Sequence, residues 1–384
     1  MLNPVFVYGV VVIATEKKTV PMFDLTRQWA GLQEDFLRSL EDFLPKQQLV
    51  LGEATSRFES QLADKLGVKH VVAVSNGTDA LLMALTALDI GPGDEVIVPA
   101  FTFFSTASVV SRLGAKPVFA DILPDTFNIN PDAIRRALSP RTRAIIPVHL
   151  FGQAAQMDDI LAIAESRKIP VVEDCAQALG AKWRGQQVGS LGKMGCFSFY
   201  PTKNLGALGE GGAVSTNSDD LARRLRRIRA QGSEERYVHE ELGGNFRLSA
   251  LQCVALSVKL PHLDGWLEMR RLNAQFYCER LEKFSGITVP HTVEGAEHSW
   301  NQFCIRTQRR DSLREFLKEN GVGTDVYYPL PVCLQPAFAE LGHRHGDFPV
   351  ADRVSAEVLA LPIFPELRQD EQEYVCDVIG QFFL

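Results

Sequence analysis

The sequence has few of the features that mark specialised classes of protein. Its seven cysteines are scattered and odd in number, and no C-x-x-C pair occurs. We therefore expect no disulfide framework, no metal site and a reducing, cytoplasmic location. Positive charge is not in excess, because 40 Lys and Arg stand against 47 Asp and Glu, for a formal net charge of −7. That balance disfavours a nucleic-acid partner.

The chain also has no long hydrophobic run. The apolar stretch from Val5 to Ala14 is too short to span a bilayer, and Thr-Glu-Lys-Lys follows it. It is a poor secretory signal as well, since no basic residue precedes it. We treat residues 1–20 as an N-terminal extension and expect no membrane partner.

Several familiar site motifs are incomplete. Gly209-Glu-Gly211 lacks the third glycine of a dinucleotide-binding turn, and Gly192-Lys193 lacks the flanking residues of a P-loop. His239-Glu240 has no second histidine at the spacing of a zinc protease. Ser75 resembles the serine of a nucleophile elbow, but Ala73 replaces the first glycine. The sequence thus gives no support to dinucleotide, ATP, zinc or serine-hydrolase chemistry.

What the sequence does contain is an alternation of short β-branched runs and amphipathic stretches between residues 70 and 230. Its 384 residues, 46% apolar and 23% charged, have the composition of a large globular protein. The alternation is typical of βα units, so we predict an α/β fold with a mainly parallel central sheet flanked by helices. The expected strands are residues 70–75, 95–99, 116–121, 144–150, 170–173, 196–200 and 212–216.

The pattern changes near residue 260. From there we predict helices over residues 263–284, 311–320 and 370–382, and few strands, such as residues 302–307. The natural division is a large α/β domain with an N-terminal arm over residues 21–262, and a smaller C-terminal α+β domain over residues 263–384.

A basic run lies on one predicted helix. It consists of Arg223, Arg224, Arg226, Arg227 and Arg229, with Leu221, Leu225 and Ile228 on the apolar face. We expect these arginines to form a solvated helical face. A nucleic-acid contact is the alternative.

Two further segments suit an anionic, aromatic ligand. Asn76-Gly77-Thr78 follows a predicted strand and starts a helix, whose free N–H groups and dipole suit a phosphate. Val171–Asp174 ends an apolar strand with carboxylates, at the sheet edge where ligands of α/β folds bind. A buried carboxylate there needs a cation, and the protonated ring nitrogen of a pyridine would serve. A helix cap or a surface ion pair is the alternative for Asp174.

A lysine and an aromatic run complete the set. Lys203 follows another predicted strand, has uncharged neighbours and precedes a glycine-rich loop. A buried lysine amine loses its charge readily and can form a Schiff base. Phe103 follows the strand at residues 95–99 and offers a ring face, although core packing is the default use of such a run. Phosphate cup, carboxylate, lysine and aromatic ring together describe what pyridoxal phosphate (PLP) requires.

From about Val20 to the C-terminus the chain resembles the DegT/DnrJ/EryC1/StrS family of sugar aminotransferases. As a set the matching motifs are highly specific. They are Asn76-Gly-Thr-Asp-Ala80, Gly91-Pro-Gly-Asp-Glu-Val-Ile-Val-Pro99, Pro147-Val-His-Leu-Phe-Gly152, Val172-Glu-Asp-Cys-Ala-Gln177, Phe197-Ser-Phe-Tyr-Pro-Thr-Lys-Asn204 and Gly244-Asn-Phe-Arg247.

The resemblance implies an aspartate aminotransferase-like (type I PLP) fold and a homodimer with active sites shared between subunits. It also implies transfer of an amino group from an amino acid, usually L-glutamate, to a nucleotide-linked keto sugar. Lys203 then matches the Schiff-base lysine, Asp174 the partner of the pyridine nitrogen, and Gln177 the neighbour of the cofactor's 3-hydroxyl. The remaining cofactor positions fall on Phe103 for ring stacking, on Gly77, Thr78 and Ser198 for the phosphate, and on Asn245 for the phosphate of the other subunit.

The substrate side of the resemblance is less complete. Where relatives often have a His after Tyr-Pro-x-Pro-Leu, this chain has Cys333. By analogy, the candidates for holding the nucleotide sugar are Arg236, Tyr237, His239, Tyr327 and Tyr328. The segment around Lys203 resembles the branch that aminates C3 of the sugar more than the C4 branch. A cyclitol or other cyclic ketone as acceptor, and a regulatory DNA-associated role, stay open.

Overall fold

The computed structural model describes residues 18–383. The apolar stretch from Val5 to Ala14 lies outside the described residues. Within them, no helix combines the length and the apolar character needed to cross a membrane.

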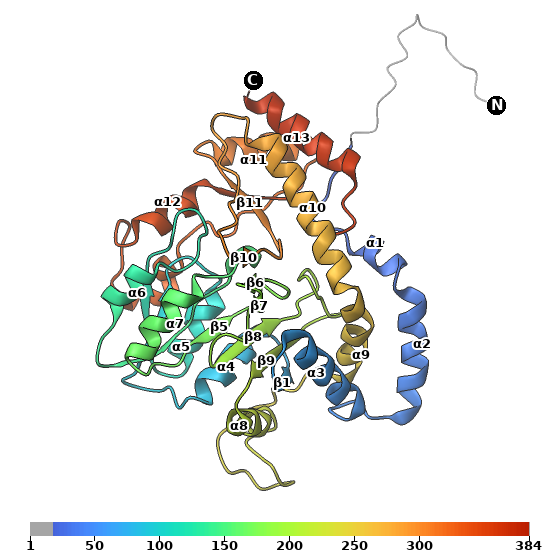
Figure 1. Cartoon of the computed structure of the whole chain (residues 1–384), viewed down its shortest axis with the longest axis vertical. Helices are drawn as coiled ribbons and strands as arrows, with labels where there is room; N and C mark the ends of the chain where they lie inside the picture. The colour runs from blue at the N-terminus through green and yellow to red at the C-terminus, as the bar shows by residue number, and fades with distance from the viewer. Residues whose placement is uncertain (1–17, 384) are drawn as a thin grey trace, which may run out of the picture.

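A mainly parallel sheet forms the centre of the molecule, as the alternating pattern predicted (Figure 1). Its order is β3-β2-β4-β5-β8-β9-β1, in which bridges from Ile145 to Val171 and from Val148 to Asp174 join β4 to β5. Only β9 runs antiparallel to its neighbours. The strands are β1 (His70–Val74), β2 (Glu95–Pro99), β3 (Lys116–Ala120), β4 (Thr142–Ile145), β5 (Val172–Asp174), β8 (Met194–Ser198) and β9 (Gly212–Thr216).

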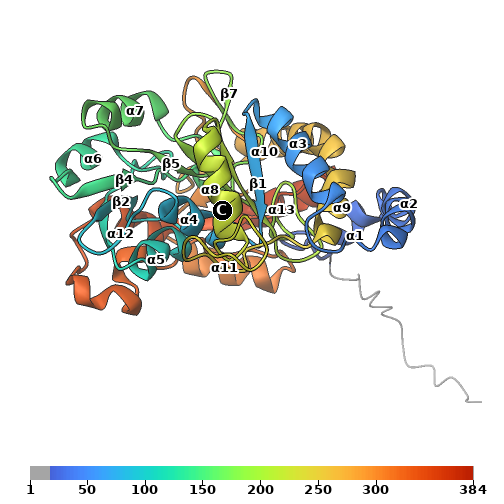
Figure 2. The same cartoon turned by 90° about the horizontal axis from the view of Figure 1, so that it is seen from below.

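Helices cover both faces of this sheet, because alternate strand residues point to opposite sides. Val96 and Val98 enter one buried cluster with α4 (Gly77–Thr86), α5 (Phe104–Arg112) and α8 (Asp219–Arg229). Ile97 enters the other cluster, on the opposite face. The helices of that face are α3 (Glu53–Leu66), α6 (Pro131–Ala137), α7 (Met157–Ser166) and α9 (Ala250–Lys259). Figure 2 shows α8 and α4 on one side of β1 and α3 and α9 on the other.

The C-terminal part has a core of its own around β11 (Phe303–Arg306) and β12 (Val358–Leu361), which pair antiparallel. The helices packed on this pair of strands are α10 (Leu263–Leu281), α11 (Arg310–Glu319) and α13 (Gln369–Phe383). The sequence predicted these three helices and β11, but neither β12 nor α12 (Pro349–Glu357). The division into domains at residue 262 stays a prediction.

Short elements complete the described chain. A small sheet, β10-β6-β7, consists of β10 (Ala296–Glu297), β6 (Lys182–Trp183) and β7 (Gln186–Gln187). The N-terminal helices are α1 (Leu25–Ala30) and α2 (Gln33–Phe43). The 3₁₀ segments are Leu44–Lys46, Leu150–Gly152, Leu260–His262, Val332–Leu334 and Pro336–Leu341.

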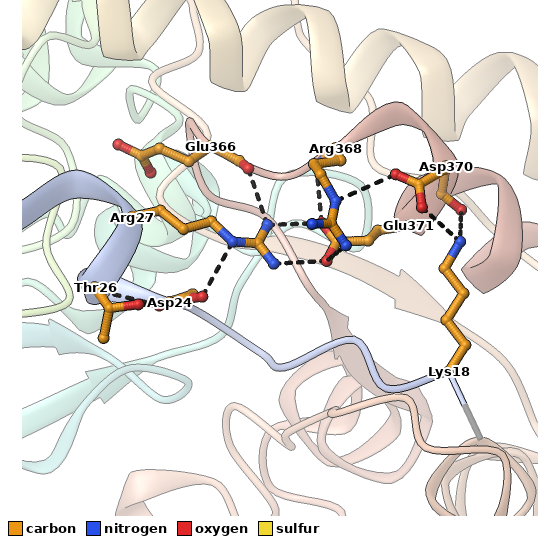
Figure 3. Close-up of polar contacts among 8 residues, drawn as sticks. All are labelled: Lys18, Asp24, Thr26, Arg27, Glu366, Arg368, Asp370 and Glu371. Carbon is orange, nitrogen blue, oxygen red and sulfur yellow. Dashed lines mark hydrogen bonds and ion pairs between the residues drawn. The ribbon is translucent and has the colours of Figure 1, made fainter. Parts of the chain in front are cut away.

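The first described residues attach to the C-terminal helix rather than to the central sheet (Figure 3). Val20 pairs with Val322, and Lys18 forms an ion pair of 2.8 Å with Asp370. Arg27 binds both oxygens of Glu371 at 2.7 Å, and this carboxylate is only 1% exposed. The Arg27 guanidinium thereby lowers the pKa of Glu371.

One predicted strand is shorter than expected. Residues 144–150 were predicted as a strand, whereas β4 ends at Ile145 and residues 150–152 form a 3₁₀ turn. Pro147 lies inside the predicted run and has no N–H for the ladder. Its carbonyl still accepts the N–H of Asp174, and the N–H of His149 donates to the Asp174 carbonyl.

The basic run of α8 is not the solvated face that the sequence predicted. Arg223 and Arg226 are exposed, but Arg224 binds Asp89 at 2.6 Å and Glu241 at 3.0 Å, and Arg227 binds Glu240 at 2.7 Å. Arg229 is buried and donates to Glu59 at 2.6 Å and to the Ala73 carbonyl at 3.0 Å. A helix dense in arginine can thus lie against acidic partners that are distant in sequence.

The buried pair gives a stability prediction. We expect Glu59→Ala to lower the free energy of unfolding by about 3 kcal/mol, because it leaves the Arg229 guanidinium buried without its carboxylate. Arg223→Ala, on the exposed face of the same helix, should stay within about 0.5 kcal/mol of the wild type. Urea denaturation followed by circular dichroism measures both. Equal effects of the two substitutions would contradict the assigned role of the buried pair.

Candidate active site

Asp174 is the last residue of β5 and lies at the carboxyl edge of the sheet, 4% exposed. Its Oδ2 accepts the hydroxyl of Thr106 at 2.8 Å and its Oδ1 accepts the N–H of Ala176 at 3.1 Å. Burial raises the pKa of Asp174, while the bonds from Ala176 and Thr106 and the charge of Lys203 oppose that rise. A nearby cation would therefore stabilise the ionised carboxylate.

A polar network behind Asp174 fixes the strand end. His149 Nδ1 accepts the N–H of Ala155 at 3.0 Å, so its Nε2 carries the proton and donates to Glu173 at 2.9 Å. Glu173 also accepts the N–H groups of Gly189, Leu191 and Gly192. His149, Glu173 and Cys175 are the one group of described residues whose side chains could hold a metal ion. Because both nitrogens of His149 and both oxygens of Glu173 already have partners, we assign this group a structural role.

Lys203 lies in the irregular loop that follows β8. Burial lowers its pKa to about 8, and the charge of Asp174 raises it. About a tenth of this amine is therefore neutral at pH 7, a far larger share than in an ordinary exposed lysine.

The start of α4 meets the end of β8. Asn76 caps the helix by accepting the N–H of Asp79 at 2.8 Å, which leaves the N–H groups of Gly77 and Thr78 ahead of the first intrahelical bond. A Cβ on Gly77 would lie 2.8 Å from the Cβ of Ser198, so only glycine permits this approach. The Thr78 hydroxyl lies 2.7 Å from that of Ser105. Three predicted phosphate-binding residues are thus brought together at a helix N-terminus.

An aromatic and amide group completes the cluster. Phe103 is 54% exposed, and its ring centre lies 6.0 Å from that of Tyr328. Gln177 donates to the Tyr328 hydroxyl at 2.9 Å and accepts the N–H of Phe151 at 2.8 Å. Tyr327 is partly buried beside Tyr328, with ring centres 5.9 Å apart. The structure therefore groups Phe103, Gln177 and Tyr328.

The other predicted substrate residues lie elsewhere in the chain. The loop after α8 projects away from the body of the molecule (Figure 1). Tyr237 in this loop is 79% exposed and accepts a hydrogen bond of 3.0 Å from Arg236, while His239 is bonded to the Gln231 carbonyl at 2.8 Å. Asn245 is exposed at the base of the loop, where it pairs with Ala230.

Two residues of the region were not understood from sequence. Thr106 bonds directly to Asp174, but nothing in the sequence distinguishes it from Thr102 in the same run. Cys333, which replaces a frequent His of the resembled family, is 2% exposed in the core near Phe338 and Ala351. Burial raises the pKa of Cys333 to about 12, which keeps the thiol neutral.

Comparison with known proteins decides the family. Residues 31–380 match the model of the DegT/DnrJ/EryC1/StrS aminotransferase family. This chain belongs to that family. It is 48% identical to a pleiotropic regulatory protein of Geobacillus stearothermophilus over 95% of this chain and 98% of that one. It is also 42% identical to a UDP-N-acetyl-3-dehydro-alpha-D-glucosamine 3-aminotransferase of Acidithiobacillus ferrooxidans, over 95% and 98% of the two chains.

The fold agrees with the family. The crystal structure of DesV from Streptomyces venezuelae superimposes with a TM-score of 0.93 at 39% identity, covering 95% of this chain and 98% of that one. The expected aspartate aminotransferase-like fold is therefore confirmed. The chain is a pyridoxal phosphate-dependent transaminase, since aminotransferases of this family use that cofactor and solved relatives include forms with bound PLP or PMP.

The residues present fit this cofactor. A buried carboxylate suits a protonated ring nitrogen, and a lysine with a lowered pKa suits an aldehyde. The capped start of α4 suits a phosphate, and the exposed ring of Phe103 leaves an apolar face for a flat group.

The lowered pKa of Lys203 can be measured. In the apoprotein, labelling of Lys203 by an acylating reagent should rise with pH around a midpoint near 8, because only the neutral amine reacts and exposed lysines have a pKa near 10.5. Peptide mass spectrometry reads each lysine separately. In Asp174→Asn the midpoint should fall further, since the carboxylate charge that raises the pKa of Lys203 is gone. A midpoint that rises in this variant would contradict the assigned contact.

Proposed function

We propose that this enzyme transfers the amino group of L-glutamate to the C3 carbonyl of a nucleotide-linked keto sugar, as a cytoplasmic homodimer with shared active sites. The observation that carries the proposal concerns Asp174, at the end of β5, and Lys203, in the loop after the neighbouring strand β8, beside the capped start of α4. The two are close enough for each charge to shift the pKa of the other group. It is supported by relatives named for the same chemistry. These are a 3-aminotransferase, 3-amino sugar transaminases and a 3-oxo-D-glucuronate aminotransferase.

Asp174 has the role of holding a proton on the cofactor's ring nitrogen. When bound, pyridoxal phosphate supplies a cationic ring that accepts the electron pair released from the donor's Cα–H bond. Asp174 remains ionised against that cation, and Thr106 orients the carboxylate through the bond to Oδ2. Because the buried carboxylate of Asp174 is less stable without a cation beside it, the empty site is disfavoured and binding of the cofactor is favoured.

Lys203 has two roles at one atom, Nζ. Nζ would hold the aldehyde carbon of the bound cofactor, and as a free amine it would remove the proton from Cα of the donor. In the second half of the cycle the same amine returns a proton to the sugar carbon. A pKa near 8 suits both the removal and the return of a proton, because the neutral and the protonated amine differ little in free energy at neutral pH.

The remaining residues bind and orient. Gly77 and Thr78 offer the phosphate their N–H groups, and Ser198 offers its hydroxyl. Phe103 covers one ring face. Gln177, fixed by Phe151 and bonded to Tyr328, lies beside the 3-hydroxyl.

The partner subunit completes each site in this proposal. Asn245 reaches the phosphate across the dimer, and the projecting loop with Arg236, Tyr237 and His239 reaches the nucleotide sugar. Tyr327 and Tyr328 line the sugar side within one chain. Leu242, near the base of this loop, is 95% exposed, and such an apolar side chain suits burial against a second copy.

A regulatory role is the second candidate, because the relative from Geobacillus stearothermophilus is named for one. A nucleic-acid contact through the arginines of α8 is disfavoured by the carboxylates that Arg224, Arg227 and Arg229 already bind. A cyclitol or other cyclic ketone acceptor differs from the main proposal only in the substrate and is resolved by the same experiment.

The function is tested with enzyme charged with glutamate and then offered a panel of ketones. The panel holds UDP- and dTDP-linked 3-keto and 4-keto sugars and unlinked cyclic ketones, and mass spectrometry detects the amine. We expect a nucleotide-linked 3-keto sugar to be aminated and Lys203→Ala to be inactive. Amination of 4-keto sugars alone would overturn the C3 assignment, and amination of free cyclic ketones alone would overturn the nucleotide-sugar assignment.

The shared site is tested by mixing two inactive variants. Lys203→Ala removes the amine, and Asn245→Asp places a carboxylate against the phosphate. Each homodimer should be nearly inactive. Mixed dimers formed by refolding the two together would hold one site with both lesions and one with neither, so activity should return. If mixed dimers form and the mixture stays as inactive as its parents, both residues serve one site within one chain.

A further inference from the structure

Lys203 lies in a loop that has no regular secondary structure to fix its backbone. Residues 199–207 contain no helix or strand. The ends of the loop are closed by a bond of 2.8 Å from the Ala207 N–H to the Phe199 carbonyl, and the N–H of Lys203 donates to the Tyr200 carbonyl at 2.8 Å. These bonds close the loop but leave its orientation to other contacts. A side chain that moves protons needs its backbone fixed to a fraction of an ångström.

Asn204, the next residue, supplies such a contact. Its side chain is buried, with 4% of the residue exposed. Its Nδ2 donates to the Ser299 carbonyl at 3.0 Å and to the Leu179 carbonyl at 3.4 Å. Its Oδ1 accepts from Asn301 Nδ2 at 3.3 Å. The amide thus joins the lysine loop to a segment almost a hundred residues later in the chain.

That segment is itself held firmly. Arg270, on α10, is buried and donates through Nη1 to the carbonyls of Trp300 at 3.0 Å and Ile363 at 3.0 Å. Helix α10 runs from the end of α9 towards α13, beside the C-terminal core (Figure 1). Two partners of Asn204, Ser299 and Asn301, therefore flank Trp300 of the C-terminal core, whereas Leu179 belongs to a core of the central sheet.

We propose that Asn204 is a positioning residue for Lys203, fixing the backbone of the lysine through Ser299, Leu179 and Asn301. The inference rests on the proposed role of Lys203 in proton transfer. Asn204 has no assigned contact with the substrate. It acts through the placement of the neighbouring amine, and the C-terminal core thereby sets the geometry of the proton transfer.

The first test uses the apoprotein. Asn204→Ala should raise the labelling midpoint of Lys203 from about 8 towards 10.5, by on the order of one pH unit, because a loosened loop admits water to the amine. Gln252→Ala is the matched control. Gln252 forms two hydrogen bonds with the backbone of Leu208, in the same glycine-rich stretch, at 2.8 and 3.3 Å. Its side chain forms no hydrogen bond with residues 199–207. Its midpoint should stay near 8, and an unchanged midpoint in Asn204→Ala would overturn the proposal.

A milder variant covers the case in which Asn204→Ala does not fold. Asn301→Ala removes only the donor to Asn204 Oδ1 and leaves both bonds from Asn204 Nδ2. Circular dichroism establishes that it is folded. We expect a midpoint shift in the same direction and smaller. A folded Asn301→Ala protein whose midpoint equals that of wild type would contradict the proposed chain of contacts.

A double-mutant cycle separates positioning of Lys203 from a general structural effect. The holoenzyme is mixed with glutamate, and the rate of the half-reaction is read from the cofactor absorbance. Asn204→Ala should slow it on the order of 10- to 100-fold when Lys203 is present. In the Lys203→Ala background, where added methylamine supplies the base, Asn204→Ala should change the rescued rate less than twofold. An equal loss in both backgrounds would overturn the proposal, whereas full activity of Lys203→Ala without amine would overturn the proposed function.

Discussion

The desolvation of opposite charges beside the ends of two neighbouring strands, β5 and β8, is the constraint on which this site depends. Desolvation acts on Asp174 and Lys203 in opposite directions, raising the pKa of the acid and lowering that of the amine, so each is pushed towards its neutral form. Their attraction opposes this effect in both. A site balanced in this way changes protonation at small free-energy cost, which is what repeated proton transfer at one amine requires.

Close contacts between backbone segments hold the parts of the site in place around Asp174 and Lys203. Gly77 lies against Ser198, and Gly212 lies against Asn76, at distances where a Cβ would collide. The start of α4 is thereby held on the ends of β8 and β9. Behind Asp174, the pair of His149 and Glu173 satisfies three loop N–H groups. The irregular segments around the site are thus ordered by side-chain bonds rather than by regular secondary structure.

Ion pairs also explain the arginine-rich helix α8 on the surface of the molecule. The arginines of α8 suggest a nucleic-acid contact only while their partners are unknown. In the fold, Glu240 and Glu241 hold Arg227 at the base of the projecting loop, and Asp89 approaches Arg224 from the end of α4. The same residues that appear as a basic run in the sequence therefore anchor the loop that we propose reaches the partner's site.

Local patterns in the sequence predicted the seven strands of the central sheet, its mainly parallel character and the positions of Asp174 and Lys203 near the ends of two of these strands. These follow from periodicity and from turn residues, which are local properties. Three contacts could be known only from the folded chain. Thr106 binds Asp174, 68 residues away, Glu59 binds Arg229, 170 residues away, and Asn204 binds the Ser299 carbonyl. Such partners have no periodic signature, because a hydrogen bond between distant residues depends on how the elements pack and leaves no spacing in the sequence.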